Sequence, residues 1–427
     1  MRLGPPVNFL KWAGLSFALI LAAAFFLVQT SALLAAGNSF YVAPGGNDSN
    51  PGTINQPFRT PQRGVNAASC GDTVYLRAGT YDGGIGANQR CTSWNSPLTL
   101  RNYPGELVTL INTGAETIFG FGTKSYPTRE DIYFVLQGVI LDAARGSSTS
   151  ACISALSVDH VRLQDLECKN AQREGIIPHG RFWELLNLNV HDNGLDTNPS
   201  HPRGHGVYLT DGNCLIDGGT YHDNGGYGIQ IFDSGSITNG NNVVRNTRIY
   251  RNNLNTSNTP LTGNGGGGIV MANGTNNVLY NSIIYGNGQS NIQVNGTCLQ
   301  CGVYNNTQFG GFTGLQIVDR FATGTVVRNN IFFGNVGQAI SDMGTGTIMT
   351  NNLTSDPRFT NSASGDFTLQ TSSPAIDAGA NLSSIVISDF RGAPRPAGNG
   401  YDIGALEFGA QPPADGVLPT VSVKASH

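Results

Sequence analysis

The apolar positions of the chain repeat in a fixed order from residue 161 onward. An apolar pair, usually an Asn, a second apolar pair and another Asn follow one another in each repeat. The clearest copies are VRLQDLECKN from Val161, LLNLNVHDNG from Leu185, VVRNTRIYRNN from Val243, VLYNSIIYGNG from Val278 and VVRNNIFFGN from Val326. A short loop and a glycine-led apolar strand come after each copy, as in GVYL and GIQI. Helical periodicity is absent from this region.

This pattern predicts an all-β parallel solenoid. Three short strands per repeat, each with period-2 apolar residues, match one coil of a parallel β-helix. No coil can bury its apolar face alone, so neighbouring coils stabilise one another. The Asn that closes each repeat is expected to stack in a ladder, because its amide bonds along the stack and tolerates left-handed backbone. The closing residues are Asn170, Asn193, Asn224, Asn252, Asn287 and Asn335.

Two flanking stretches resemble a known superfamily. The segment from Phe40 to Tyr81 resembles the amino-terminal coil of secreted right-handed β-helix proteins of the pectate-lyase-like superfamily, with PFRTPQRGVNAA as a short helical cap. The segment from Asp356 to Phe408, including SSPAIDAG and GYDIGALEF, resembles a module that ends such bacterial chains. The resemblance implies a right-handed β-helix. Because this scaffold carries lyases, hydrolases, epimerases and non-catalytic surface proteins, it leaves the activity open.

The amino terminus has the order of a secretory signal. Arg2 and Lys11 precede an apolar run, and small residues follow it up to Ala36. The run is intermediate in length, so an uncleaved membrane anchor is the alternative. The expected organisation is residues 1–36 as signal peptide or membrane anchor, 37–100 as amino-terminal cap and first coils, 101–352 as right-handed β-helix, 353–408 as carboxy-terminal capping module and 409–427 as flexible tail.

The charge composition argues against nucleic acid as a binding partner. Charged residues form only 12% of the chain and the net charge is −4, which gives no electrostatic case for nucleic acid. Seven cysteines in an exported chain favour disulfides. We expect Cys298–Cys301 as a local pair and Cys70–Cys91 as a second one, while Cys152, Cys168 and Cys214 stay open. We also expect a monomer that is secreted or at the cell surface, without membrane contact after signal cleavage.

Six of the seven histidines lie between residues 160 and 222. When the repeats are registered on the closing Asn, His191 and His222 should stack about one strand spacing apart, with Asp192 and Asp223 stacked beside them. The same register places Lys169 in the Asp row. Each of these groups can also be read as a packing ladder or a turn-closing carboxylate.

Clustered polar groups on neighbouring coils favour a site for an acidic polysaccharide. Lyase-type β-elimination needs a donor for the uronate carboxylate, a base and an acid. His205 is the candidate base, Tyr208 the acid and Lys169 a second base. The candidate substrate-binding residues are His179, Arg181, His191, Asp192, Arg203, His222, Asp223, Gln230 and Arg251.

The resemblance also brings alternatives. Calcium-dependent β-helix pectate lyases need several carboxylates around the ion, and this chain offers only Asp192, Asp196 and Asp223 at the matching coils. Calcium is therefore a possible cofactor rather than a required one. A non-catalytic extracellular binding or structural solenoid, a glycoside hydrolase and a uronate epimerase are the other interpretations.

The amino-terminal segment gives the first testable prediction. Intact-mass measurement on exported material should show that residues up to Ala36, or up to Ala32, have been removed. A retained amino terminus would instead support the membrane anchor. The same measurement, with and without reductant and alkylation, should show Cys298 and Cys301 oxidised.

Overall fold

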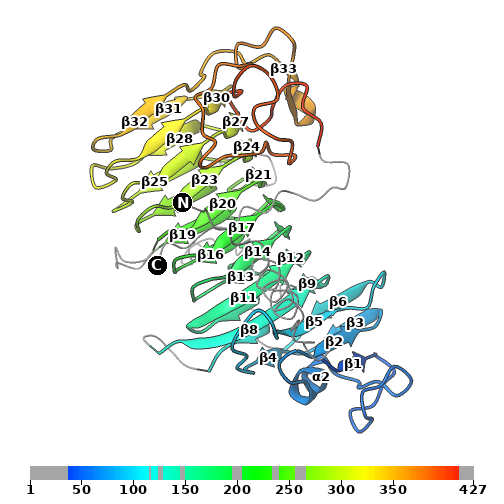
Figure 1. Ribbon diagram of the computed structural model, residues 1–427. Coiled ribbons are helices and arrows are strands. Elements are labelled where there is room, and N and C mark those ends of the chain that lie inside the picture. Colours follow the sequence, from blue (N-terminus) through cyan, green and yellow to red (C-terminus); the bar gives the residue numbers. More distant parts are fainter. Residues whose placement is uncertain are drawn as a thin grey trace, which may run out of the picture. The chain divides into compact units, whose positions relative to one another are not determined.

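The computed structural model describes residues 37–114, 117–123, 128–144, 150–194, 204–232, 240–254 and 266–412. It confirms the predicted parallel β-helix, in which each complete coil contributes one strand to each of three parallel sheets (Figure 1). Sheet 1 consists of β1 (Ser39–Val42), β2 (Thr73–Leu76), β5 (Leu98–Asn102), β8 (Glu130–Gln137), β11 (Val158–Gln164), β14 (Glu184–Leu186), β17 (Leu215–Asp217), β20 (Val243–Arg245), β23 (Val278–Tyr280), β26 (Gly302–Tyr304), β29 (Val326–Arg328) and β32 (Ile348–Thr350).

Sheets 2 and 3 follow sheet 1 in each coil. Sheet 2 consists of β3 (Gly79–Asp82), β6 (Val108–Ile111), β9 (Ile140–Asp142), β12 (Glu167–Lys169), β15 (Asn189–His191), β18 (Thr220–His222), β21 (Arg248–Tyr250), β24 (Ile283–Tyr285), β27 (Thr307–Phe309) and β30 (Ile331–Phe333). Sheet 3 consists of β4 (Ile85–Ala87), β7 (Thr117–Phe121), β10 (Ala151–Ala155), β13 (Ile176–Ile177), β16 (Val207–Leu209), β19 (Ile229–Phe232), β22 (Gly267–Ala272), β25 (Ser290–Asn295), β28 (Thr313–Ile317) and β31 (Ile340–Asp342).

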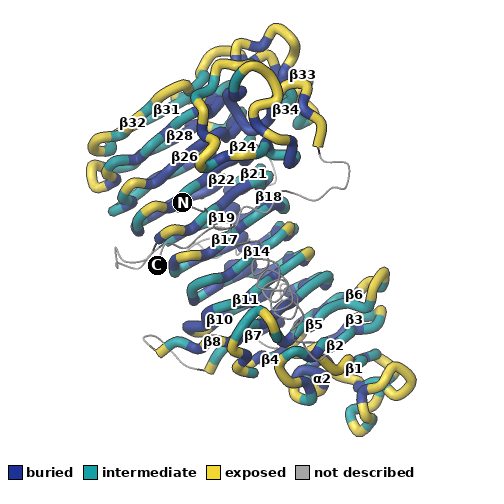
Figure 2. The backbone as a smooth tube through the Cα atoms, viewed as in Figure 1, coloured by how far each residue is buried: buried dark blue, intermediate teal, exposed yellow. Residues whose placement is uncertain are grey.

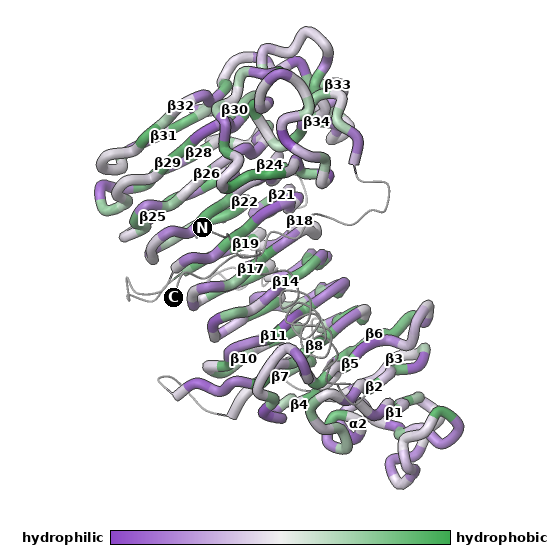
Figure 3. The backbone as a smooth tube through the Cα atoms, viewed as in Figure 1, coloured by the Kyte–Doolittle hydropathy of each residue, from purple (hydrophilic) through white to green (hydrophobic). Residues whose placement is uncertain are grey.

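The strands bury alternate side chains in one continuous core. Val190, Tyr221 and Ile249, at the centres of successive sheet 2 strands, are fully buried, while their flanking residues are partly exposed. Figure 2 shows the most exposed segments mainly in turns and towards the ends of the solenoid, and Figure 3 shows apolar stretches along the strands. The predicted two-residue periodicity therefore reports inward and outward positions.

A buried amide ladder joins the coils at the corner between sheets 2 and 3. The Nδ2 of Asn193 donates to the Oδ1 of Asn224 at 3.1 Å, and the same bond joins Asn224 to Asn252 and Asn252 to Asn287, each at 3.0 Å. All four side chains are buried. Each rung also satisfies polar groups that cannot reach water, which is the condition for burying an amide.

Two of the six predicted ladder residues lie elsewhere. Lys169 pairs in register with His191, so Asn170 falls one position too early and the backbone N–H of Ala171 donates to Asn193 instead. Asn335 exchanges hydrogen bonds with Gln308. The predicted alignment of the coil that contains Lys169 is therefore wrong by one residue, and Lys169 belongs to the histidine row rather than to the aspartate row.

The predicted amino-terminal helix caps the solenoid. Helix α2 (Pro61–Ala67) begins after Thr60, whose Oγ1 accepts the backbone N–H of Arg63, and buries Pro61, Gly64 and Val65. Proline at the first helical position is preorganised for this start. Across the described residues, no helix has both the length and the apolar character to cross a bilayer.

The carboxy-terminal residues fold back onto the sheets. The hairpin of β33 (Phe359–Asn361) and β34 (Asp366–Leu369), joined by the 3-10 helix η1 (Ser362–Ser364), packs on sheet 2 through aromatic rings. Phe367 lies 5.6 Å from Phe309 and 5.1 Å from Tyr285 between ring centroids. Tyr401 joins a second buried cluster with Tyr280 and Tyr304 on sheet 1.

The cysteines form three disulfides. Cys70–Cys91 and Cys298–Cys301 are bonded as predicted, and Cys152 bonds Cys168 between neighbouring strands of sheets 3 and 2. Cys214 is unpaired and buried.

The ladder predicts unequal responses to the same substitution. Asn252→Asp should lower the free energy of unfolding by on the order of 3 kcal/mol, because it buries a carboxylate between amides that cannot neutralise it. Asn276→Asp is the matched control, since Asn276 is an exposed left-handed residue in an outer amide pair. Chemical denaturation of both variants measures the difference in the free energy of unfolding. Equal stabilities would contradict a stabilising role for the buried Asn252 amide.

Candidate functional site

The predicted residues separate into two groups on different sheets. The first group is a column on sheet 2, in which Lys169, His191, His222, Tyr250 and Tyr285 are in register. Ring centroids are 4.9 Å apart from His191 to His222, 4.7 Å from His222 to Tyr250 and 5.0 Å from Tyr250 to Tyr285, and the rings are nearly parallel. The predicted stacking of His191 on His222 is thus present, as part of a longer aromatic column.

The polar atoms of this column bind one another. Nδ1 of His191 lies 2.8 Å from Asp192 Oδ2, and Nε2 lies 3.3 Å from Glu167 Oε1. The same Glu167 oxygen accepts the ammonium of Lys169 at 2.5 Å. Since Lys169 is engaged with a carboxylate beside an imidazole, its expected role as a free base has no support in this geometry.

The second imidazole of the column repeats the arrangement. Nδ1 of His222 lies 2.6 Å from Asp223 Oδ2, and Nε2 lies 3.2 Å from Asn189 Oδ1. Arg251 donates Nε–H to Asp223 Oδ1 at 2.9 Å. Burial alone would raise the pKa of Asp223, but the hydrogen bonds from His222 and Arg251 outweigh burial and lower this pKa. The carboxylate is therefore ionised and internally paired.

The second group lies on sheet 3, where His205 precedes β16 and Tyr208 lies within it. Their ring centroids are 5.7 Å apart. Nδ1 of His205 accepts the backbone N–H of Tyr227 at 2.9 Å, and burial lowers the pKa of His205 to about 4. The neutral ring then carries its proton on Nε2. In this geometry the ring offers a hydrogen-bond donor and resists protonation, which favours a donor role for His205 over the expected role as a base.

Glu174 completes this group and was missed by the sequence reasoning. Burial raises the pKa of Tyr208, and the charge of Glu174 raises it further, so the phenol keeps its proton. Glu174 is only 8% exposed. Its nearest cation is the guanidinium Nε of Arg173, 3.8 Å from Oε2. An alignment on the glycine before each sheet 3 strand would have found it, since the preceding residue runs Glu174, His205, Tyr227.

Outward-facing residues of neighbouring sheet 3 strands lie beside the group formed by Glu174, His205 and Tyr208. Tyr208 pairs in register with Gln230. Gln293 lies two strands further along the same row and accepts the hydroxyl of Tyr227. We call the surface formed by Glu174, His205, Tyr208 and Gln230 the sheet 3 site.

Other predicted residues lie apart from this surface or outside the described chain. His179 follows β13, and its Nδ1 lies 2.8 Å from Thr210 Oγ1. Burial lowers the pKa of His179, against the opposing charges of Asp211 and Glu174. Arg181 binds Asp159 through Nε at 3.0 Å and through Nη2 at 2.7 Å. Its guanidinium therefore stabilises the corner between sheets 3 and 1. Asp196 and Arg203 fall outside the described residues.

The predicted calcium ligands do not form a metal centre in the described part of the chain. No group of three or more His, Cys, Asp or Glu side chains within those residues has a metal-binding arrangement. Asp192 and Asp223 point to imidazoles of their own coils. A Ca²⁺ ion takes six to eight oxygen ligands, which these two committed carboxylates cannot supply.

Comparison with known proteins gives a family. A profile described as "Pel9A-like, right handed beta helix region" matches residues 40–310. Among solved structures, a pectate lyase Pel9A is similar at a TM-score of 0.65 with 19% identity, covering 88% of this chain and 97% of that one. A rhamnogalacturonan lyase is similar at a TM-score of 0.59 with 16% identity, covering 76% of this chain and 91% of that one. These likenesses show the right-handed β-helix fold.

Two curated proteins match over short segments. The uncharacterized protein YwoF of Bacillus subtilis is 39% identical over 74 residues, which are 17% of this chain and 16% of that protein. Pectate lyase PEL9 of Emericella nidulans is 42% identical over 79 residues, which are 18% of each chain. The matched segments therefore span less than a fifth of these relatives.

The half-buried imidazole of His205 predicts a pH dependence of stability. With a folded pKa of about 4 against an ordinary value of 6.5, His205 binds its proton more readily in the unfolded chain. Its contribution, about 3 kcal/mol, is complete above pH 6.5 and is lost as the pH falls from 6.5 towards 4. Thermal unfolding across this range should show a slope that His205→Gln reduces and His160→Gln retains, because the lowered pKa of His179 contributes the remainder. An unchanged slope in the His205 variant would show that other groups titrate.

Proposed function

Because this chain belongs to the Pel9A-like right-handed β-helix family, we propose that it is an exported protein that cleaves acidic polysaccharides by β-elimination at the sheet 3 site. The observation that carries the proposal is the convergence of Glu174, His205 and Tyr208 on one face of two neighbouring coils. The pectate lyase and rhamnogalacturonan lyase that share the fold support a uronate-containing glycan as substrate. We place the protein outside the cell, as the amino-terminal pattern indicates.

The proposed reaction assigns one task to each side chain. Glu174 removes the proton on the carbon next to the uronate carboxylate, and the electron pair forms the new carbon–carbon double bond. The bond to the glycosidic oxygen breaks as Tyr208 donates its proton to that oxygen. The high pKa of Tyr208 supports this role, since the phenol enters the reaction protonated.

Neutral and cationic donors would hold the substrate carboxylate. His205 offers Nε2–H as a donor that costs no protonation. Arg173 lies beside Glu174, and its buried Nε atom has no hydrogen-bond partner among the described residues. Donors aimed at the carboxylate stabilise the enolate-like charge that develops in the transition state. This assignment replaces His205 as base and leaves Lys169 outside the reaction.

A non-catalytic glycan-binding solenoid is the second candidate. The observation that favours it is the internal pairing of the sheet 2 column, where His191, Asp192, His222, Asp223 and Arg251 bind each other. Groups that are paired in this way stabilise a surface more readily than they exchange protons.

Variants of the sheet 3 site test the lyase. Tyr208→Phe and Glu174→Gln should each lower kcat on polygalacturonate by about 100-fold or more, because each removes a proton-transfer group. Ser341→Ala is the matched control, since Ser341 occupies the same outward row at the far end of sheet 3. The ultraviolet absorbance of the unsaturated product measures turnover, with and without a calcium chelator.

Two outcomes would oppose the proposal. Retained turnover in both variants would move the reaction away from the sheet 3 site. Absence of unsaturated product from polygalacturonate, rhamnogalacturonan and alginate with the wild-type protein, together with measurable binding of one of them, would establish the binding solenoid instead.

A further inference from the structure

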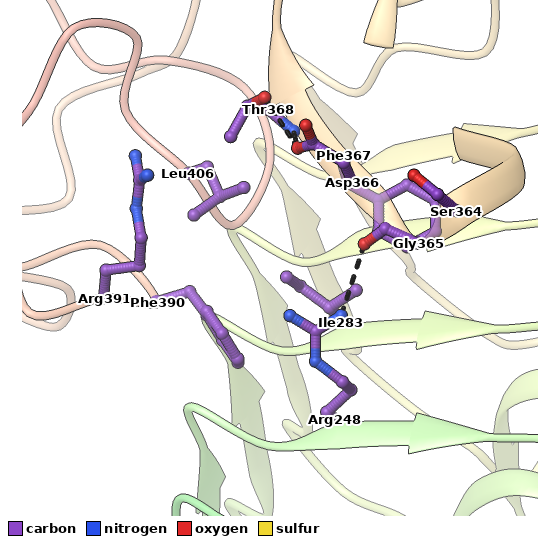
Figure 4. A pocket seen from close by; sticks show the side chains of 10 residues that line it. All are labelled: Arg248, Ile283, Ser364, Gly365, Asp366, Phe367, Thr368, Phe390, Arg391 and Leu406. Atoms are coloured by element: carbon purple, nitrogen blue, oxygen red, sulfur yellow. Dashed lines mark hydrogen bonds between the residues drawn. The ribbon is translucent and has the colours of Figure 1, made fainter. Parts of the chain in front are cut away.

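A separate cavity lies at the seam between sheet 2 and the carboxy-terminal residues. It has a volume of about 320 Å³, within the range of small-molecule sites. Figure 4 shows Arg248 extending from β21 towards Gly365, with Phe390 and Arg391 across from it. The cavity is thus built from segments more than a hundred residues apart in sequence, and none of its lining residues belongs to the sheet 3 site.

The two arginines of this cavity have spare hydrogen-bonding capacity. Arg248 donates one bond, from Nη1 to the carbonyl of Gly365 at 3.4 Å, and its guanidinium lies 5.4 Å over the Phe390 ring. No ion pair of the described residues includes Arg248. Arg391 has a buried Nε without a hydrogen-bond partner in that same part of the chain. Since a guanidinium carries five N–H donors, most of them are available to a ligand.

One of the two cations has a carboxylate partner. Nε of Arg391 forms an ion pair with Oδ2 of Asp389 at 3.8 Å, although Asp389 does not line the cavity. Asp366 is the acidic residue that lines the cavity, and its Oδ1 accepts the backbone and side-chain donors of Thr368 at 3.0 and 2.7 Å. Asp389 therefore offsets the charge of Arg391, and Arg248 is the lining cation that forms no ion pair with a described residue.

Apolar groups supply the remaining wall. Ile283, Phe367, Phe390 and Leu406 line the cavity beside the charged groups. This combination suits a small ring with C–H faces, hydroxyl groups and one anionic substituent. The guanidinium of Arg248 matches a carboxylate in geometry, and the free oxygen of Asp366 can accept a hydroxyl.

We propose that this cavity is a second carbohydrate site that binds a single hexuronate residue, with its carboxylate on Arg248 and its hydroxyls on Asp366 and Arg391. The unpaired guanidinium of Arg248 carries the choice of an anionic ligand, whereas the choice of a sugar acid rests on the proposed function. This second site holds one residue of the acidic glycan at the seam, while the sheet 3 site cleaves the same glycan at another residue.

Monosaccharide binding tests this site without turnover, because galacturonate has no glycosidic bond to cleave. Titration calorimetry on the full-length protein should show binding of galacturonate, weaker binding of neutral galactose and a Kd about tenfold higher or more in Arg248→Gln. Arg391→Gln should weaken binding independently, which keeps the test decisive if Arg248→Gln fails to fold. Arg320→Gln is the control, because Arg320 is exposed and stacks on Phe321 outside the cavity.

The outcomes separate this site from the proposed reaction. Galacturonate binding that both arginine variants leave unchanged, or galactose binding of equal strength, would overturn the site. Inorganic phosphate that binds more tightly than galacturonate would overturn the sugar acid as ligand. Binding that depends on Arg248 without any lyase turnover would keep the site and reject the reaction, and the reverse result would keep the reaction alone.

Discussion

The buried side-chain amide ladder is the constraint on which the rest of the molecule depends. Parallel strands of three residues offer few backbone hydrogen bonds each, and a slip of one residue would turn every core side chain outward. The bonds from Asn193 through Asn287 oppose such a slip, because each amide finds its partner in only one register. The ladder therefore converts a weakly specified repeat into a single alignment of coils.

That alignment also assembles the sheet 3 site. Glu174 comes from one coil, and His205 and Tyr208 come from the next, so their distances are set by strand spacing rather than by a flexible loop. The neighbouring backbone sets the chemistry as well. The Tyr227 N–H, supplied by a third coil, occupies the imidazole nitrogen that would otherwise act as a base. The register of the coils thus determines where the side chains of the sheet 3 site lie and which nitrogen of His205 carries the proton.

The sequence reveals the periodic features of this protein well and the local ones poorly. The β-helix, its helical cap and the stacking of His191 on His222 follow from spacing, because repeated coils bring repeated positions together. The one-residue error at Lys169 arose because its coil has Ala171 where the following coils have the ladder Asn. Glu174 escaped notice because the sheet 3 repeats were compared from the glycine onward, whereas Glu174 is the residue before that glycine. The low pKa of His205 depends on neighbours in another coil, which no local pattern reports.

The distribution of the thiols has a consequence for how the chain matures. The three disulfides close loops with sequence separations of 21, 16 and 3 residues, so each pair meets within one coil or its immediate neighbour. Short loops close at a small cost in chain entropy, so each pair can meet before distant coils have formed. The remaining thiol, Cys214, is enclosed by the coil stack, and burial raises its pKa to about 12. Thiolate is the attacking species in disulfide exchange. Once its coil has formed, the buried Cys214 therefore no longer exchanges with the three disulfides.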